Sequence, residues 1–136
     1  MPESVEQVSS VYARRTERGL DVTHPAIDPT IPPSGPGCVE CLATDDGWWF
    51  HLRRCAQCGH IGCCDSSPSQ HASRHAAEAG HPVATSFEPG EDWFWDYAAE
   101  DEVEPADLMP PLAHPLDQPT PGPAGRVPDD WEERLH

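Results

Sequence analysis

One stretch, residues 38–81, holds all six cysteines and five of the eight histidines of this 136-residue chain. Its cysteines form two Cys-x2-Cys pairs and one adjacent pair: Cys38, Cys41, Cys55, Cys58, Cys63 and Cys64. A Cys-x2-Cys turn directs two thiolates at one centre, and Zn²⁺ prefers four soft or borderline ligands arranged as a tetrahedron. Two such pairs followed by a spaced run of histidines rarely arise by chance, so the stretch predicts a metal-binding unit.

The number of ligands predicts two zinc ions. The two pairs, one of the adjacent cysteines, and the histidines His71, His75 and His81 supply eight ligands, which fill two closed tetrahedral sites. A segment this small is marginal with a hydrophobic core alone. A structural zinc contributes about 10–16 kcal/mol of apparent folding free energy to small fingers, so we expect the segment to unfold without metal.

His71 and His75 allow two assignments. They are four residues apart, so they lie on one face of the helix predicted around them. They can share one metal, as in a His-Glu-x2-His protease helix, but Ser73 and Arg74 stand between them and the glutamate base is missing. Alternatively, each histidine closes a different site.

The stretch resembles the UBP-type zinc finger, the ubiquitin-binding finger of some deubiquitinases and a histone deacetylase. The resemblance covers residues 38–97, and it is carried by the two cysteine pairs, Trp48, the Cys58–Cys63 knuckle, His71-x3-His75, the Gly80–Val83 run and the aromatic Trp93–Tyr97 segment. It implies two interleaved sites, one made by Cys38, Cys41, Cys63 and His71, the other by Cys55, Cys58, His75 and His81.

The adjacent cysteines leave a choice of ligand. Counting from Cys58, the family spacing selects Cys63, whereas counting back from His71 it selects Cys64. We expect Cys63 to bind zinc, because the glycine-rich knuckle before it sets its direction. Cys64 is then a small buried residue beside the metal.

The resemblance also implies a pocket for a peptide tail, lined by Trp48 and framed by Trp95 and Tyr97. In ubiquitin-binding members, an arginine two residues after the knuckle cysteine grips the carboxylate of the ubiquitin tail. Here Asp65 stands at that place, and a carboxylate repels a carboxylate. We therefore expect an unidentified protein or peptide as the partner and do not expect ubiquitin, unless Arg53 or Arg54 substitutes from the neighbouring strand.

Charge and hydropathy narrow the partners further. The formal net charge is −16, with no lysine and only eight arginines, so the chain lacks the clustered cations that bind nucleic acid. No apolar stretch approaches the ~20 residues of a membrane span, and the start of the chain lacks a secretory signal. We expect a cytoplasmic protein whose cysteines bind metal and form no disulfides.

The pattern predicts an α+β fold in three parts. Residues 1–37 carry a helix over 4–18 and a proline-rich linker, and residues 38–98 form the finger, a small zinc-stabilised antiparallel sheet with one or two helices. Within the finger we expect strands at 48–52, 83–87 and 93–97 and a helix at 69–80. Residues 99–136 are an acidic, proline-rich tail, predicted to be disordered up to about residue 127 and then to form a short helix.

These features favour a non-catalytic module that binds a peptide or protein. A catalytic zinc keeps one position for water, whereas both predicted sites are filled by protein ligands. Two alternatives remain open: a structural or adaptor finger whose acidic tail carries the interaction, and a redox switch based on oxidation of zinc-bound thiolates.

Overall fold

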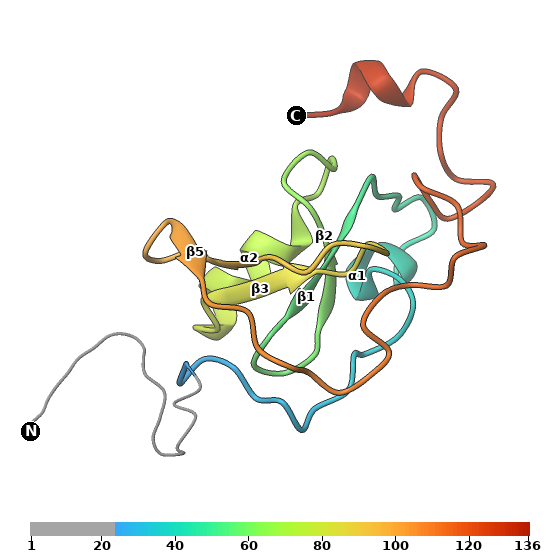
Figure 1. Cartoon of the computed structure of the whole chain (residues 1–136). Helices are drawn as coiled ribbons and strands as arrows, with labels where there is room; N and C mark the ends of the chain where they lie inside the picture. Colours follow the sequence, from blue (N-terminus) through green and yellow to red (C-terminus); the bar gives the residue numbers. More distant parts are fainter. Residues whose placement is uncertain (1–23) are drawn as a thin grey trace, which may run out of the picture.

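The computed structural model describes residues 24–136, so the predicted helix over residues 4–18 lies outside the described part of the chain. At its centre is a five-stranded antiparallel sheet in the order β2-β1-β3-β4-β5 (Figure 1). Its strands are β1 (Leu52–Cys55), β2 (Ile61–Cys63), β3 (Val83–Ser86), β4 (Phe94–Asp96) and β5 (Asp101–Val103). The helices are α1 (Val39–Leu42), α2 (His71–Ala79) and the short 3₁₀ helix η1 (Trp131–Arg134). The expected small α+β fold is confirmed.

Helix α2 lies against the β2 end of the sheet, where Gly62 permits a close approach. A Cβ atom on Gly62 would stand only 2.7 Å from the backbone nitrogen of Ala72. The helix buries Ala72 and Ala76 and ends at Gly80, whose φ of 71° is the left-handed conformation that favours glycine. Small residues on both sides therefore bring the histidines of α2 close to the strand that carries Cys63.

The strand expected at residues 48–52 forms differently. Strand β1 begins at Leu52, and Trp49 instead forms an isolated antiparallel bridge with Gly122, far along the chain. The Trp49 N–H donates to the Gly122 carbonyl at 2.8 Å, and the Gly122 N–H donates back at 3.0 Å. The strand predicted from the alternation of aromatic residues is therefore not formed as one element, because the chain bends at Phe50 and His51 and Trp49 finds its hydrogen-bond partner outside the sheet.

Residues 99–136, predicted to be largely disordered, run along the surface of the finger and contact it at several points. Strand β5 adds to the sheet beside β4, and the chain then runs beneath the sheet next to the proline-rich linker (Figure 1). Arg54, only 2% exposed, donates to the carbonyl oxygens of Ile31, Met109 and Pro111 at 2.8, 2.9 and 3.1 Å. The physical reason for the difference is that this segment needs little core of its own, because the finger supplies its hydrogen-bond partners.

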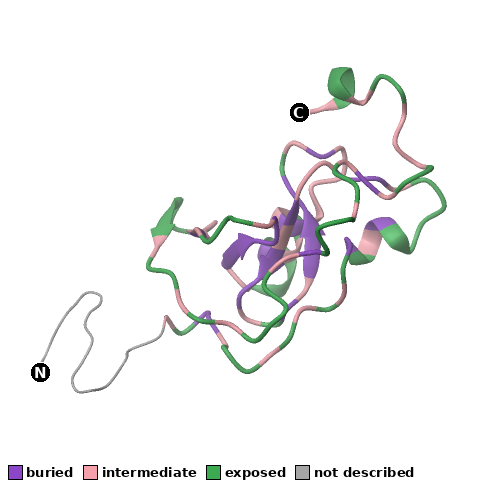
Figure 2. Cartoon of the chain, turned by 45° about the vertical axis from the view of Figure 1, so that its right-hand side comes forward, coloured by how far each residue is buried: buried purple, intermediate pink, exposed green. Residues whose placement is uncertain are grey.

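A second anchor holds this segment further along. His114 is 6% exposed, its backbone N–H donates to the Phe87 carbonyl, and its Nε2 lies 3.0 Å from a Glu88 carboxylate oxygen. The other Glu88 oxygen accepts the N–H of Leu52 at 2.8 Å. Buried residues are concentrated in the strands, while the C-terminal segment is mainly exposed between its anchors (Figure 2). Within residues 24–136, no helix has the length and apolar character needed to cross a membrane.

Candidate metal centre

The first metal cluster joins helix α1, strand β2 and the start of α2. Cys38 caps the N-terminus of α1 through its sulfur, and Cys41 lies one turn later in the same helix. Their Sγ atoms lie 3.3 and 3.4 Å from His71 Nδ1, and Cys63 Sγ lies 3.4 Å from the same nitrogen. All three cysteines are buried. We call this cluster site 1.

The second cluster joins the end of β1 and the turn after it to the middle of α2 and the residues that follow that helix. Cys58 Sγ lies 3.3 Å from His75 Nε2, and Cys55 Sγ lies 3.7 Å from His81 Nδ1. His81 follows Gly80, so the left-handed turn at the end of α2 returns this ligand toward the cluster. Cys58 is exposed, in contrast to the cysteines of site 1. We call this cluster site 2.

The geometry of both clusters fits zinc. In each, the four ligand atoms lie within 4.8 Å of one another. Zn–S and Zn–N bonds of about 2.3 and 2.1 Å place tetrahedral ligand atoms about 3.6–3.8 Å apart, close to the separations found here. Two separate clusters can thus each bind a zinc ion, in the sets that the resemblance implies: Cys38, Cys41, Cys63 and His71, and Cys55, Cys58, His75 and His81.

The acidity of the thiols explains what metal adds to these clusters. Burial raises the pKa of Cys55 to about 11, so this thiol stays protonated at neutral pH when no metal is bound. In site 1, hydrogen bonds from the thiols of Cys38 and Cys41 hold the pKa of Cys63 well below its usual range. The site therefore favours one thiolate by itself, and zinc displaces the remaining protons because it binds the thiolate form.

The two adjacent cysteines point in different directions. Cys63 Sγ belongs to site 1, whereas Cys64 Sγ lies 3.4 Å from Ser67 Oγ, in the loop that follows β2. Both side chains are buried, so burial alone does not distinguish them. Cys63 is the last residue of β2 and Cys64 is the first residue after it, so the two thiols separate where the strand ends.

Comparison with known proteins agrees with this geometry. Residues 38–108 match the family model of the zinc finger in ubiquitin hydrolases and other proteins. The chain belongs to this family. The match extends beyond the boundary expected at residue 98 and includes β5. No curated protein matches the chain significantly.

A solved structure shares the fold of this zinc finger. The chain is similar to protein RPA1320 from Rhodopseudomonas palustris, determined by solution NMR, with 43% sequence identity and a TM-score of 0.54. The similarity covers 68% of this chain and 85% of that one.

The predicted ligand-binding residues differ in exposure. Trp48 is 9% exposed and so presents little surface, whereas Trp95 and Tyr97 are half-buried on and after β4. Burial, followed by the nearby Asp65 carboxylate, raises the pKa of Tyr97 to about 12. Asp65 itself is exposed, two residues after β2. The Asp65 carboxylate is thus close enough to Tyr97 for its charge to raise the pKa of the phenol.

The structure also decides between the two neighbouring arginines. The guanidinium carbon of Arg53 lies 4.7 Å from the centroid of a Trp93 ring, and its charge acts on Tyr97. Arg54 is buried on the opposite face. The alternation of a strand was the available signal for this difference, but the sequence alone did not say which face was which. Trp93 was part of the recognised aromatic segment but was not among the predicted ligand-binding residues.

Proposed function

We propose that this zinc finger is a non-catalytic module that binds a peptide or protein segment through the surface formed by Arg53, Trp93, Tyr97 and Asp65. The observation that carries the proposal is the Arg53 guanidinium over the Trp93 ring, next to a half-exposed tyrosine. Aromatic rings and arginine supply most of the energy at protein-binding surfaces. Both zinc clusters have four protein ligands, which favours a structural role for the metals.

The charges on this surface restrict the ligand. Arg53 provides a guanidinium that can bind a carboxylate bidentately, while Asp65 opposes a second negative charge nearby. A charged hydrogen bond is worth about 1.5–3 kcal/mol, so loss of the family arginine lowers affinity by one to two orders of magnitude at about 1.4 kcal/mol per tenfold. Although Arg53 lies on this surface, Asp65 occupies the place of the family arginine, and we therefore do not expect free ubiquitin to bind with the strength that its tail reaches in the ubiquitin-binding members.

Calorimetry with ubiquitin tests the role of Asp65. We expect weak or undetectable binding to the wild-type finger and tighter binding to Asp65→Arg, because the substitution replaces repulsion with attraction. Tight binding to the wild type contradicts the exclusion of ubiquitin. Equally weak binding to both proteins means that the rest of the ubiquitin pocket is absent.

A peptide library displayed on phage tests the binding surface without assuming a ligand. We expect peptides that enrich on the wild-type protein to lose binding to Arg53→Ala and Trp93→Ala and to keep it with Arg74→Ala, an exposed arginine on α2. Peptides that bind all four proteins equally place the interaction elsewhere.

One observation favours the adaptor alternative. Leu112 and Leu116, in the C-terminal segment, are 59% and 87% exposed, although both are large apolar residues. If this segment carries the interaction, the enriched peptides lose binding to Leu112→Ser and Leu116→Ser and not to the Arg53 and Trp93 variants. The same library therefore separates the two functions.

A further inference from the structure

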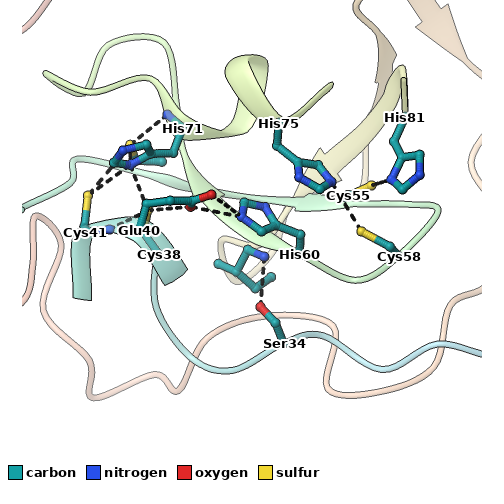
Figure 3. A network of polar contacts seen from close by, with 12 residues as sticks. Ser34, Cys38, Glu40, Cys41, Cys55, Cys58, His60, His71, His75 and His81 are labelled. Carbon is teal, nitrogen blue, oxygen red and sulfur yellow. Dashed lines mark hydrogen bonds and ion pairs between the residues drawn. The ribbon is translucent and has the colours of Figure 1, made fainter. Parts of the chain in front are cut away.

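His60 is a non-ligand side chain between the two metal sites. It lies two residues after Cys58 and directly precedes strand β2, which carries Cys63. Figure 3 shows its ring between Glu40, on the side of site 1, and His75, on the side of site 2. The His60 side chain is 14% exposed, against 43% for Glu40.

The edge of the His60 ring contacts Glu40. His60 Nε2 lies 2.9 and 2.8 Å from the two carboxylate oxygens of Glu40, so the Nε2–H group is shared by both acceptors. Glu40 belongs to α1, between the site 1 ligands Cys38 and Cys41, and one of its oxygens lies 3.9 Å from Cys38 Sγ. The hydrogen-bonded His60 therefore restrains the helix that presents two ligands of site 1.

The face of the same ring contacts a ligand of site 2. The rings of His60 and His75 are stacked, with centroids 4.0 Å apart and planes 4° from parallel. His75 uses its Nε2 atom toward Cys58 and also meets His81 edge-on, with centroids 5.4 Å apart. The stack thus restricts rotation of the His75 ring in the orientation that directs Nε2 at the site 2 centre.

We propose that Glu40 and His60 couple the two zinc sites, so that each zinc ion strengthens the binding of the other. Zinc at site 2 fixes His75, the stacked His75 fixes the His60 ring, and the fixed ring holds Glu40 and helix α1. Zinc at site 1 fixes helix α1, and through it Glu40, His60 and His75 in the reverse order. Groups that orient metal ligands from outside the coordination sphere commonly change metal affinity by about 10–100-fold.

The coupling predicts the order in which the two zinc ions are lost. Site 2 contains the exposed Cys58, so its zinc is more accessible to a chelator than the zinc of site 1, whose cysteines are buried. When site 2 empties, His75 is released and the restraint on α1 is lost. The zinc of site 1 then leaves faster than it does while site 2 is full.

Native mass spectrometry of the metal-free protein titrated with zinc tests this proposal. For the wild type, we expect the second zinc to bind at least about fivefold more tightly than independent sites allow, so the one-zinc species stays scarce. In Glu40→Ala and His60→Ala the coupling should fall and the one-zinc species should accumulate. Glu78→Ala is the matched control, because Glu78 is an exposed acid on α2 whose charge acts on His75 as that of Glu40 does.

Two further measurements keep the test decisive. His60→Phe keeps a ring that can stack and removes the N–H donor, so its coupling should lie between that of the wild type and that of His60→Ala. Binding of two zinc ions at excess metal establishes that a variant folds. A His60 variant that binds fewer than two zinc ions is left out, and the comparison then rests on Glu40→Ala. If Glu40→Ala retains the wild-type coupling, folding alone links the two sites and the proposal is overturned.

Discussion

At the scale of single residues, the identity of a side chain mattered less than the direction in which it points. Cys63 and Cys64 are the same residue type, both are buried, and they are adjacent, yet only Cys63 Sγ lies among the ligands of site 1. Arg53 and Arg54 form a similar pair, one lying over Trp93 and the other bonded to three backbone carbonyls. In the arginine pair the alternation of β1 separates the two side chains, and in the cysteine pair they separate at the end of β2.

The two cysteines can be distinguished by metal content. Cys63→Ser should release one zinc ion, because a serine hydroxyl is a poor substitute for a thiolate in a site of this kind. Cys64→Ser should keep two, since Cys64 Sγ lies 3.4 Å from Ser67 Oγ and outside both metal clusters of the described residues. Elemental analysis of protein purified without chelator measures both. Loss of metal from Cys64→Ser would show that the ligand is misassigned.

At the scale of elements, the position of α2 depends on the absence of a side chain in β2. Gly62 pairs with Arg53 in the sheet, and its Cα faces the first turn of the helix. The same turn carries His71, which means that any displacement of α2 moves a ligand of site 1. Local pattern predicted this helix well, because its apolar face and its terminal Gly80 are properties of nearby residues.

Substituting Gly62 tests the link between helix packing and zinc binding. The Cβ of Gly62→Ala would lie 2.7 and 2.9 Å from Ala72 N and Cα and 3.0 Å from the carbonyl carbon of His71. Because these are backbone atoms, the start of α2 has to move, and we expect a loss of about 1–3 kcal/mol in unfolding free energy. Zinc release from site 1 should also become faster.

Urea denaturation and the rate of zinc transfer to a coloured chelator measure these two effects. Gly35→Ala serves as the control, since nothing lies within 4 Å of the added Cβ. If Gly62→Ala and Gly35→Ala behave alike, the close approach of helix and strand does not constrain the site.

At the scale of the whole molecule, the sheet is covered by segments with little regular structure. The linker before residue 38 and the segment after residue 103 meet around the buried guanidinium of Arg54, whose pKa burial lowers. Trp49 is held similarly, because a Cβ on either Gly37 or Gly122 would approach its ring within 2.7 and 3.3 Å. The described fold is therefore larger than the metal-binding stretch.

Arg54→Met tests this anchor. The substitution preserves an apolar chain and leaves the carbonyls of Ile31, Met109 and Pro111 without their donor, at a cost of about 1–3 kcal/mol in unfolding free energy. Arg74→Met, on the exposed face of α2, should have no such effect. Urea denaturation measures the cost. Amide exchange at His114, whose N–H bonds Phe87, should also accelerate if the segment detaches; unchanged exchange would mean that Arg54 does not hold it.

The sequence by itself determined the family, the two zinc ions and the small antiparallel sheet, because these follow from spacings within short pieces of chain. A Cys-x2-Cys turn sets its own ligand geometry, and a glycine ends a helix without help from distant residues. Only the tertiary structure decided that Arg53 joins the aromatic surface while Arg54 does not, and that the proline-rich segment covers the sheet. These features depend on which buried hydrogen-bonding groups of the finger remain without partners once it has formed. The proline-rich segment pairs with these groups through backbone carbonyls, which every residue has and which therefore leave no signal in the sequence.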